Sequence, residues 1–120
     1  MAMSINKVPE NYKSPSLRRW RVMEVLFKDG KRSRHVWGHD VANDAGRASS
    51  AIRMFDIEAM TATTDSGRIY KLVGAPGNAR SGEKAWKGWC SLNGVVVAKD
   101  VTTEYFDPGH IFIEHGDDTL

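Results

Sequence analysis

The stretch that most constrains this chain is a predicted β-hairpin between residues 60 and 73. Asp65-Ser66-Gly67 lies at its centre, where glycine accepts positive φ and aspartate can hydrogen-bond within its own turn. The flanking residues, 60–64 and 68–73, are β-branched or alternate in part between polar and apolar. Two such runs around a short turn with glycine are typical of a hairpin. We therefore expect this hairpin at the centre of a small sheet.

A second hairpin is predicted over residues 17–41. In residues 17–28, apolar side chains alternate onto both faces of a strand: Trp20, Val22 and Leu26 on one, and Met23, Val25 and Phe27 on the other. An amphipathic helix is the competing interpretation, because this segment also holds several good helix formers. The strand is favoured because Asp29-Gly30, a strong turn signal, follows directly. Residues 31–41 then supply the return strand, with His35, Trp37 and His39 on one face.

One short helix is predicted after a loop at residues 74–80. Ser81 is the expected N-cap, and Asn93-Gly94 is the expected end. Between them the apolar residues recur near helical spacing: Ala85, Trp86, Trp89 and Cys90. This spacing predicts a helix that lays two tryptophans on the sheet. A strand at 95–98, a helical turn at 100–106 capped by Asp100, and an edge strand at 110–115 complete the prediction.

The predicted fold class is α+β, mainly β. We expect one bent antiparallel sheet or SH3-like partial barrel of five to seven strands, with one short Trp-bearing helix. The resemblance to small SH3-like barrels is general, and that architecture hosts unrelated functions, so it supplies no function here. The length of 120 residues favours a single domain. Residues 1–16 are predicted to be a flexible arm, 17–116 the domain and 117–120 a frayed tail.

The charge and the cysteine content limit where this protein is expected in the cell and which partners it is expected to bind. The chain holds 17 basic and 15 acidic side chains, a net charge of +2. Residues 1–60 carry 11 basic and 7 acidic residues (+4), and residues 61–120 carry 6 and 8 (−2). Cys90 is the only cysteine, which excludes an intrachain disulfide and a cysteine-built metal cage. A reduced, cytoplasmic location and no contact with a membrane are the expectations.

Motifs that carry chemistry are weak in this sequence. Residues 77–84 resemble a phosphate-binding loop, but Glu83 occupies the position where that loop needs lysine. His35 and His39 would lie roughly 13 Å apart on a strand, too far to share one metal ion without a bend. Cys90 is expected beside Trp86 as a buried, inert thiol. We therefore predict no catalytic residue, no metal site and no cofactor, and a protein that is not an enzyme.

Basic residues give the strongest functional signal. Seven lie between Leu17 and His35, against only Glu24 and Asp29: Arg18, Arg19, Arg21, Lys28, Lys31, Arg32 and Arg34. On one hairpin they would form a surface that attracts an acidic partner. The preferred hypothesis is a small binding protein that acts through a protein partner or self-association. Nucleic-acid binding is the alternative, with Trp20 and Trp37 stacking on bases. A small enzyme with an unrecognised site is the third hypothesis.

Overall fold

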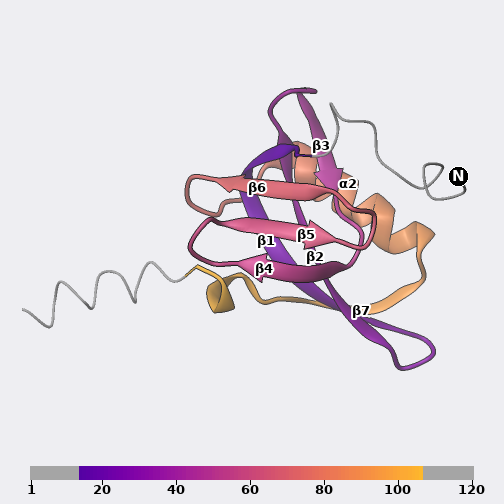
Figure 1. Ribbon diagram of the computed structural model, residues 1–120. Coiled ribbons are helices and arrows are strands. Elements are labelled where there is room, and N and C mark those ends of the chain that lie inside the picture. The colour runs from indigo at the N-terminus through magenta and orange to yellow at the C-terminus, as the bar shows by residue number, and fades with distance from the viewer. Residues whose placement is uncertain (1–13, 107–120) are drawn as a thin grey trace, which may run out of the picture.

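A computed structural model describes residues 14–106 and shows a mainly β fold with one α-helix in that range (Figure 1). The elements, in chain order, are β1 (Ser16–Phe27), β2 (Arg32–Asp40), β3 (Ala45–Ala48), β4 (Ile52–Asp56), β5 (Thr61–Thr64), β6 (Ile69–Val73), α2 (Arg80–Leu92), β7 (Val95–Asp100) and a 3₁₀ turn, η2 (Thr102–Glu104). The predicted α+β class, with up to seven strands and one Trp-bearing helix, is confirmed.

Both predicted hairpins are present, and glycine forms the turn in each. β1 and β2 are antiparallel and joined by a turn in which Gly30 has φ of +87°. The strand interpretation of residues 17–28 is therefore correct. β5 and β6 are antiparallel around Gly67, which has φ of +91° and donates its amide to the carbonyl of Thr64 at 2.9 Å. A residue with a Cβ would be strained at either glycine.

The seven strands form one mixed sheet in the order β3-β2-β1-β6-β5-β4, with β7 also paired to β1. The second edge of β1 is shared: its start pairs with β6 in parallel, and its end pairs with β7 antiparallel. The parallel pair arises because β6 returns alongside the start of β1 after the β4–β5–β6 meander. The β1–β2 register shifts between Arg18 and Arg21, and such a bulge bends a strand. The bent sheet places β4, β5 and β6 as a layer in front of β1 and β2 (Figure 1).

The β1–β2 hairpin is buried on both faces, which explains why both faces of β1 are apolar. The core between the two layers contains Leu17, Trp20, Val22, Val36, Ala62, Tyr70, Leu72 and Val101. On the opposite face, α2 packs Trp86 against Val25 and Trp37. Trp86 and Trp89 stack at 5.3 Å between ring centroids, as expected for a helix anchored by two tryptophans.

Some local details differ from the sequence predictions. Ser81 is not the helix cap: α2 begins at Arg80, and the cap residue Ala79 makes no side-chain bond. Asp100 ends β7 and accepts a hydrogen bond from the amide of Thr102 at 2.9 Å, so it stabilises the start of η2 from outside. The predicted strand at 110–115 and tail at 117–120 lie outside the described residues. The predicted arm lies outside them up to residue 13, and β1 already begins at Ser16.

Candidate interaction surface

The seven basic residues predicted as a binding site do not form one surface. Arg18 and Arg19 lie near the start of β1, whereas Lys28 and Lys31 lie at the hairpin turn. At about 3.3 Å per residue, the ten residues from Arg18 to Lys28 span roughly 30 Å. The structure therefore gives two basic ends, and side chains between them pair with acidic residues of the same chain.

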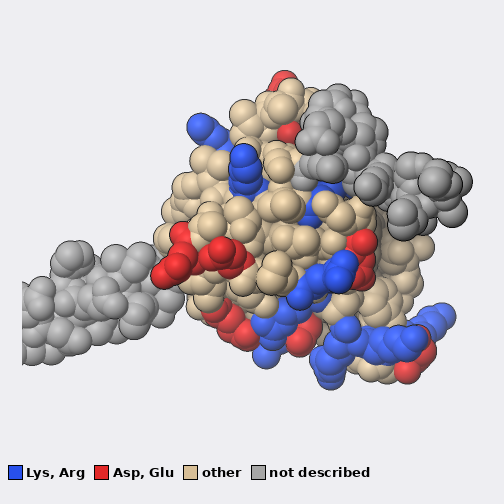
Figure 2. All heavy atoms as spheres, viewed as in Figure 1, with Lys and Arg blue, Asp and Glu red and all other residues tan. Residues whose placement is uncertain are grey.

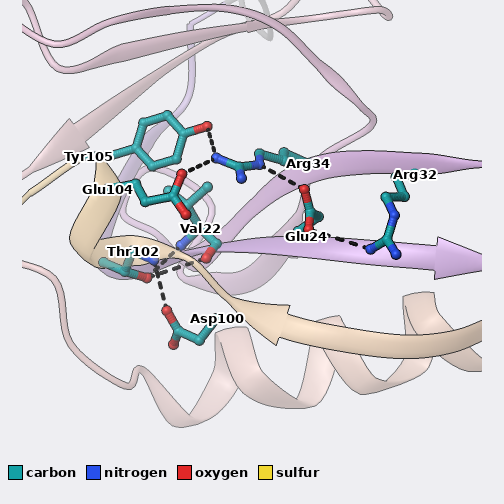
Figure 3. A network of polar contacts seen from close by, with 8 residues as sticks. All are labelled: Val22, Glu24, Arg32, Arg34, Asp100, Thr102, Glu104 and Tyr105. Carbon is teal, nitrogen blue, oxygen red and sulfur yellow. Dashed lines mark hydrogen bonds and ion pairs between the residues drawn. The ribbon is translucent and has the colours of Figure 1, made fainter.

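Arg34 is bonded within the protein on three sides (Figure 3). Its Nη1 donates to Glu104 Oε1 at 2.7 Å and to the Tyr105 hydroxyl at 2.9 Å, and its Nε donates to Glu24 Oε2 at 3.3 Å. These bonds, led by the one to Glu104, hold the pKa of Arg34 above its ordinary value. The guanidinium joins the segment after β7 to the first hairpin, so it is a structural charge.

Two further arginines of the set are also paired. Arg21 Nε donates to Asp100 Oδ2 at 2.8 Å, and Arg32 lies 3.7 Å from Glu24 while its side chain stays 62% exposed. Burial alone would raise the pKa of Asp100, but hydrogen bonds from Thr102 and Arg21 outweigh it and hold this pKa below its usual value. Arg32 is thus only loosely held, whereas Arg21 is fixed against β7.

Arg18 and Arg19 border a hollow of about 320 Å³ that is also lined by Val73, Gly74 and Ala75. Arg19 has φ of +48°, an uncommon conformation for a long side chain, which coincides with the bulge in β1. Both arginines are exposed, and neither forms an ion pair with an acidic residue in the range 14–106. Within residues 14–106 they are thus the basic side chains of β1 that form no ion pair.

The two tryptophans expected to stack on bases are buried in the core. Trp20 is fully covered between the layers, and its Nε1 donates to the carbonyl of Gly74 at 3.1 Å. Trp37 is 4% exposed under α2. Neither ring presents a face to solvent, so neither can supply the stacking platform that binding of single-stranded nucleic acid needs.

A largely uncharged surface lies on the outer face of β4, β5 and β6 (Figure 2). Ala62, Tyr70 and Leu72 point into the core, so the alternate residues on the same strands point outward. This outer face displays Met54, Thr61, Thr63, Ile69, Lys71 and Val73. Met54 is 64% exposed and Ile69 is 40% exposed. Ile57, just after β4, is 58% exposed. We call this set of residues, with Asp56, the outer face.

An open groove of about 470 Å³ runs over the outer face. Its lining includes Met54, Asp56, Ile57, Thr63 and Ile69. The threonine hydroxyls between the two apolar rims are hydrated in the free protein, and in a complex they need a hydrogen-bond partner in place of that water.

Comparison with protein-family models, with curated proteins and with solved structures finds no match to this chain. The function must therefore be inferred from the chemistry of its own surfaces.

Ser81, His39 and Asp44 form a hydrogen-bonded chain that resembles a hydrolase triad in composition. Ser81 Oγ lies 2.7 Å from His39 Nδ1, and His39 Nε2 lies 3.0 Å from Asp44 Oδ1. The side chain of Asp44 is 94% exposed, whereas the carboxylate of a working triad is buried so that it can fix the imidazole. The chain of bonds therefore ties the start of α2 to the turn after β2.

The remaining candidate residues have structural partners. His35 is buried, and its ring nitrogens lie 3.0 Å from the Ser49 carbonyl and 2.7 Å from Ser33 Oγ. No group of three potential metal ligands occurs among residues 14–106. Burial raises the pKa of the half-buried Cys90 thiol, which disfavours the reactive thiolate.

The longest helix in this range, α2, is too short and too polar to cross a membrane.

The outer face was not identified from sequence. A signal was present: Ile69 and Val73 alternate with Tyr70 and Leu72, so β6 is apolar on both faces. The sequence predicts only one helix before residue 100, and one helix covers only one sheet face. An apolar face was therefore left without a cover, but locating it required knowledge of which strands α2 packs against.

Proposed function

We propose that this chain is a small non-enzymatic binding protein that acts through protein–protein contact, with the outer face as its contact surface. The observation that carries the proposal is the gathering of exposed Met54, Ile57 and Ile69 around one groove. Single exposed apolar residues are ordinary, but a contiguous apolar patch rimmed by charge is typical of an interaction site. The proposal includes a cytoplasmic location, because a sequence with a single cysteine has no disulfide framework of the kind that secreted domains use.

The basic residues that stay available have a secondary role in this proposal. Arg18 lies beside Val73 in the β1–β6 ladder and therefore borders the outer face. Its charge would steer an acidic partner and raise the association rate more than it raises the affinity. Lys28, Lys31 and Arg32 at the hairpin turn lie farther away and contribute to the long-range field.

Nucleic-acid binding has less support, because the two candidate stacking rings are buried and Arg21 and Arg34 are paired within the chain. An enzymatic function has less support as well, because the Ser81–His39–Asp44 arrangement leaves its carboxylate in water. Neither alternative predicts that a charge added to the outer face abolishes the capture of a protein partner.

The test adds one negative charge at the centre of the outer face. Thr63→Glu places a carboxylate between Met54 and Ile69, where a bound partner would have to desolvate it. Ser91→Glu is the matched control, since it adds the same charge to an exposed position on α2, on the other side of the β1–β2 hairpin. Thermal melts establish that both variants fold.

Tagged protein is then used to capture partners from an extract of the native host, with and without nuclease. We expect the wild type and Ser91→Glu to capture a partner protein and Thr63→Glu to lose it. An untagged copy of the same chain counts as such a partner. Nuclease should change nothing. Equal retention by Thr63→Glu, or retention that nuclease abolishes, would contradict the proposal, and so would the absence of any retained protein.

A further inference from the structure

We infer that the partner of the outer face is a second copy of this chain, packed face to face about a two-fold axis parallel to β5. This inference rests on the proposed binding role of the outer face and adds the identity of the partner. It follows from the strand register, which makes the outer face complementary to itself.

The register places outward residues in two rows across the strands. Thr61 of β5 pairs with Lys71 of β6 on one side and with Asp56 of β4 on the other. Directly paired residues on neighbouring strands point to the same side of a sheet, so these three form one row. β5 is therefore the central strand, with opposite charges on its two neighbours.

The second row has apolar side chains at both ends. Thr63 of β5 pairs with Ile69 of β6 and with Met54 of β4. A rotation of 180° about an axis along β5 places β5 opposite itself and exchanges β4 with β6. Ile69 of each copy then meets Met54 of the other, and each contact occurs twice, as in any isologous interface.

The same rotation pairs opposite charges. Lys71 of each copy meets Asp56 of the other, which gives two ion pairs, one on each side of the axis. Asp56 Oδ1 already accepts a hydrogen bond from the amide of Ala59 at 3.0 Å, and Oδ2 accepts no hydrogen bond from the residues in the range 14–106. Farther along the strands, Arg18 beside Val73 would approach the acidic Glu58 of the other copy. On the outer face Lys71 lies on β6 and Asp56 on β4, so a two-fold axis along β5 brings these unlike charges together, while the exposed Arg53 of β4 lies 3.7 Å from Asp65 of its own chain.

The area of the outer face sets the expected affinity of the dimer. Three strands about 4.8 Å apart, each of about five residues, cover only roughly 15 by 15 Å. A stable complex buries about 800 Å² on each partner, and the β4–β5 turn and the Arg18 margin enlarge this face only in part. We therefore expect a weak dimer that forms and dissociates with concentration.

The test reverses each of the two charges in turn, at Lys71 and at Asp56. Sedimentation velocity over a concentration series measures the association of each variant. Lys71→Glu alone places Glu opposite Asp56, and Asp56→Lys alone places Lys opposite Lys71. Each variant should associate at least about tenfold more weakly than the wild type, because two attractive pairs become repulsive. An equimolar mixture should regain wild-type association, because both pairs in the mixed dimer are again of opposite sign. Asp56→Asn keeps an acceptor for the Ala59 amide and serves as the control for the turn.

A second measurement does not depend on charge. Thr63 faces its own copy across the axis, and face-to-face sheets lie about 10 Å apart, which is too far for a direct disulfide but within reach of a short bis-maleimide cross-linker. Thr63→Cys in a Cys90→Ser background should therefore form a covalent dimer with that reagent. Ser91→Cys in the same background should stay monomeric. Wild-type protein that stays monomeric to millimolar concentration would overturn the inference, as would a mixture that fails to regain association or a Thr63→Cys variant that does not cross-link. If Thr63→Glu still abolishes capture of a different protein, the proposed function stands and only the identity of the partner is overturned.

Discussion

Two glycines of α2 allow the docking of the helix to be tested with one chemical change at two positions. A Cβ built at Gly82 would lie 2.7 Å from the backbone Cα, C and O atoms of Gly38 in β2. A Cβ built at Gly88, farther along the same helix, meets nothing within 4 Å. Gly82→Ala in the first turn and Gly88→Ala in the interior make the same chemical change in one helix and differ chiefly in packing.

The magnitude follows from these distances. Replacement of glycine by alanine inside a helix stabilises it by roughly 0.5–1 kcal/mol, which is the full expectation for Gly88→Ala. Overpacking costs about 1–3 kcal/mol, and the upper end applies at Gly82 because the neighbour is backbone of a central strand and cannot rotate away. Gly82→Ala should therefore lose about 2 kcal/mol net, out of the roughly 5–15 kcal/mol that stabilises a domain of this kind.

Urea denaturation followed by tryptophan fluorescence measures the effect, because Trp86 and Trp89 lie on the docked face of the helix. The two variants should differ by about 3 kcal/mol, with wild type between them and the m-value unchanged. A Gly82→Ala variant as stable as Gly88→Ala would show that the first turn of α2 does not touch β2 as described.

Two other predictions concern charge and pH. Arg34→Gln should cost about 1.5–3 kcal/mol, because it breaks charged hydrogen bonds to Glu24 and Glu104, whereas Arg32→Gln should stay within about 0.5 kcal/mol; equal urea midpoints would contradict the assigned network. Burial lowers the pKa of His35, although its bond to the Ser49 carbonyl opposes this, so the unfolded chain binds a proton more readily than the folded protein does. Stability should therefore decrease as the pH falls below the ordinary histidine pKa of about 6.5, and His35→Gln should remove that part of the slope; a variant with the wild-type slope would exclude His35 as the cause.

Local turn chemistry explains why the hairpins and the helix were predictable. Gly30 and Gly67 adopt the positive φ that their sequence context indicates, and Asn93-Gly94 ends α2 as expected, with Gly94 at φ of +65°. Each of these features depends on a few neighbouring residues. Ser81 failed as a cap because its hydroxyl bonds to His39, 42 positions earlier, and no local pattern reports that contact.

The predicted binding site could not be judged from sequence for the same reason. Arg34 bonds to Glu104, 70 positions away, and Arg21 bonds to Asp100, 79 positions away. A count of basic residues along a hairpin treats them all as free, but contacts within the chain fix Arg21 and Arg34, hold Arg32 loosely and leave the other four at two separate ends. The parallel pairing of β1 with β6 is equally non-local, since it depends on how the whole meander returns to the first strand.

The outer face stays exposed because this fold has few elements that can pack against its sheet layers. The β1–β2 hairpin has two apolar faces, and α2 and the β4–β5–β6 layer cover them, one on each side. The β4–β5–β6 layer packs one of its faces against the β1–β2 hairpin. Its other face is the outer face, and no element in the range 14–106 packs against it. The hydroxyl groups of Thr61 and Thr63 are hydrated on that face. The exposed side chains of Met54 and Ile69 would gain free energy if a protein partner removed their apolar surface from water. The layer that completes the core is thus also the layer that presents the surface for association.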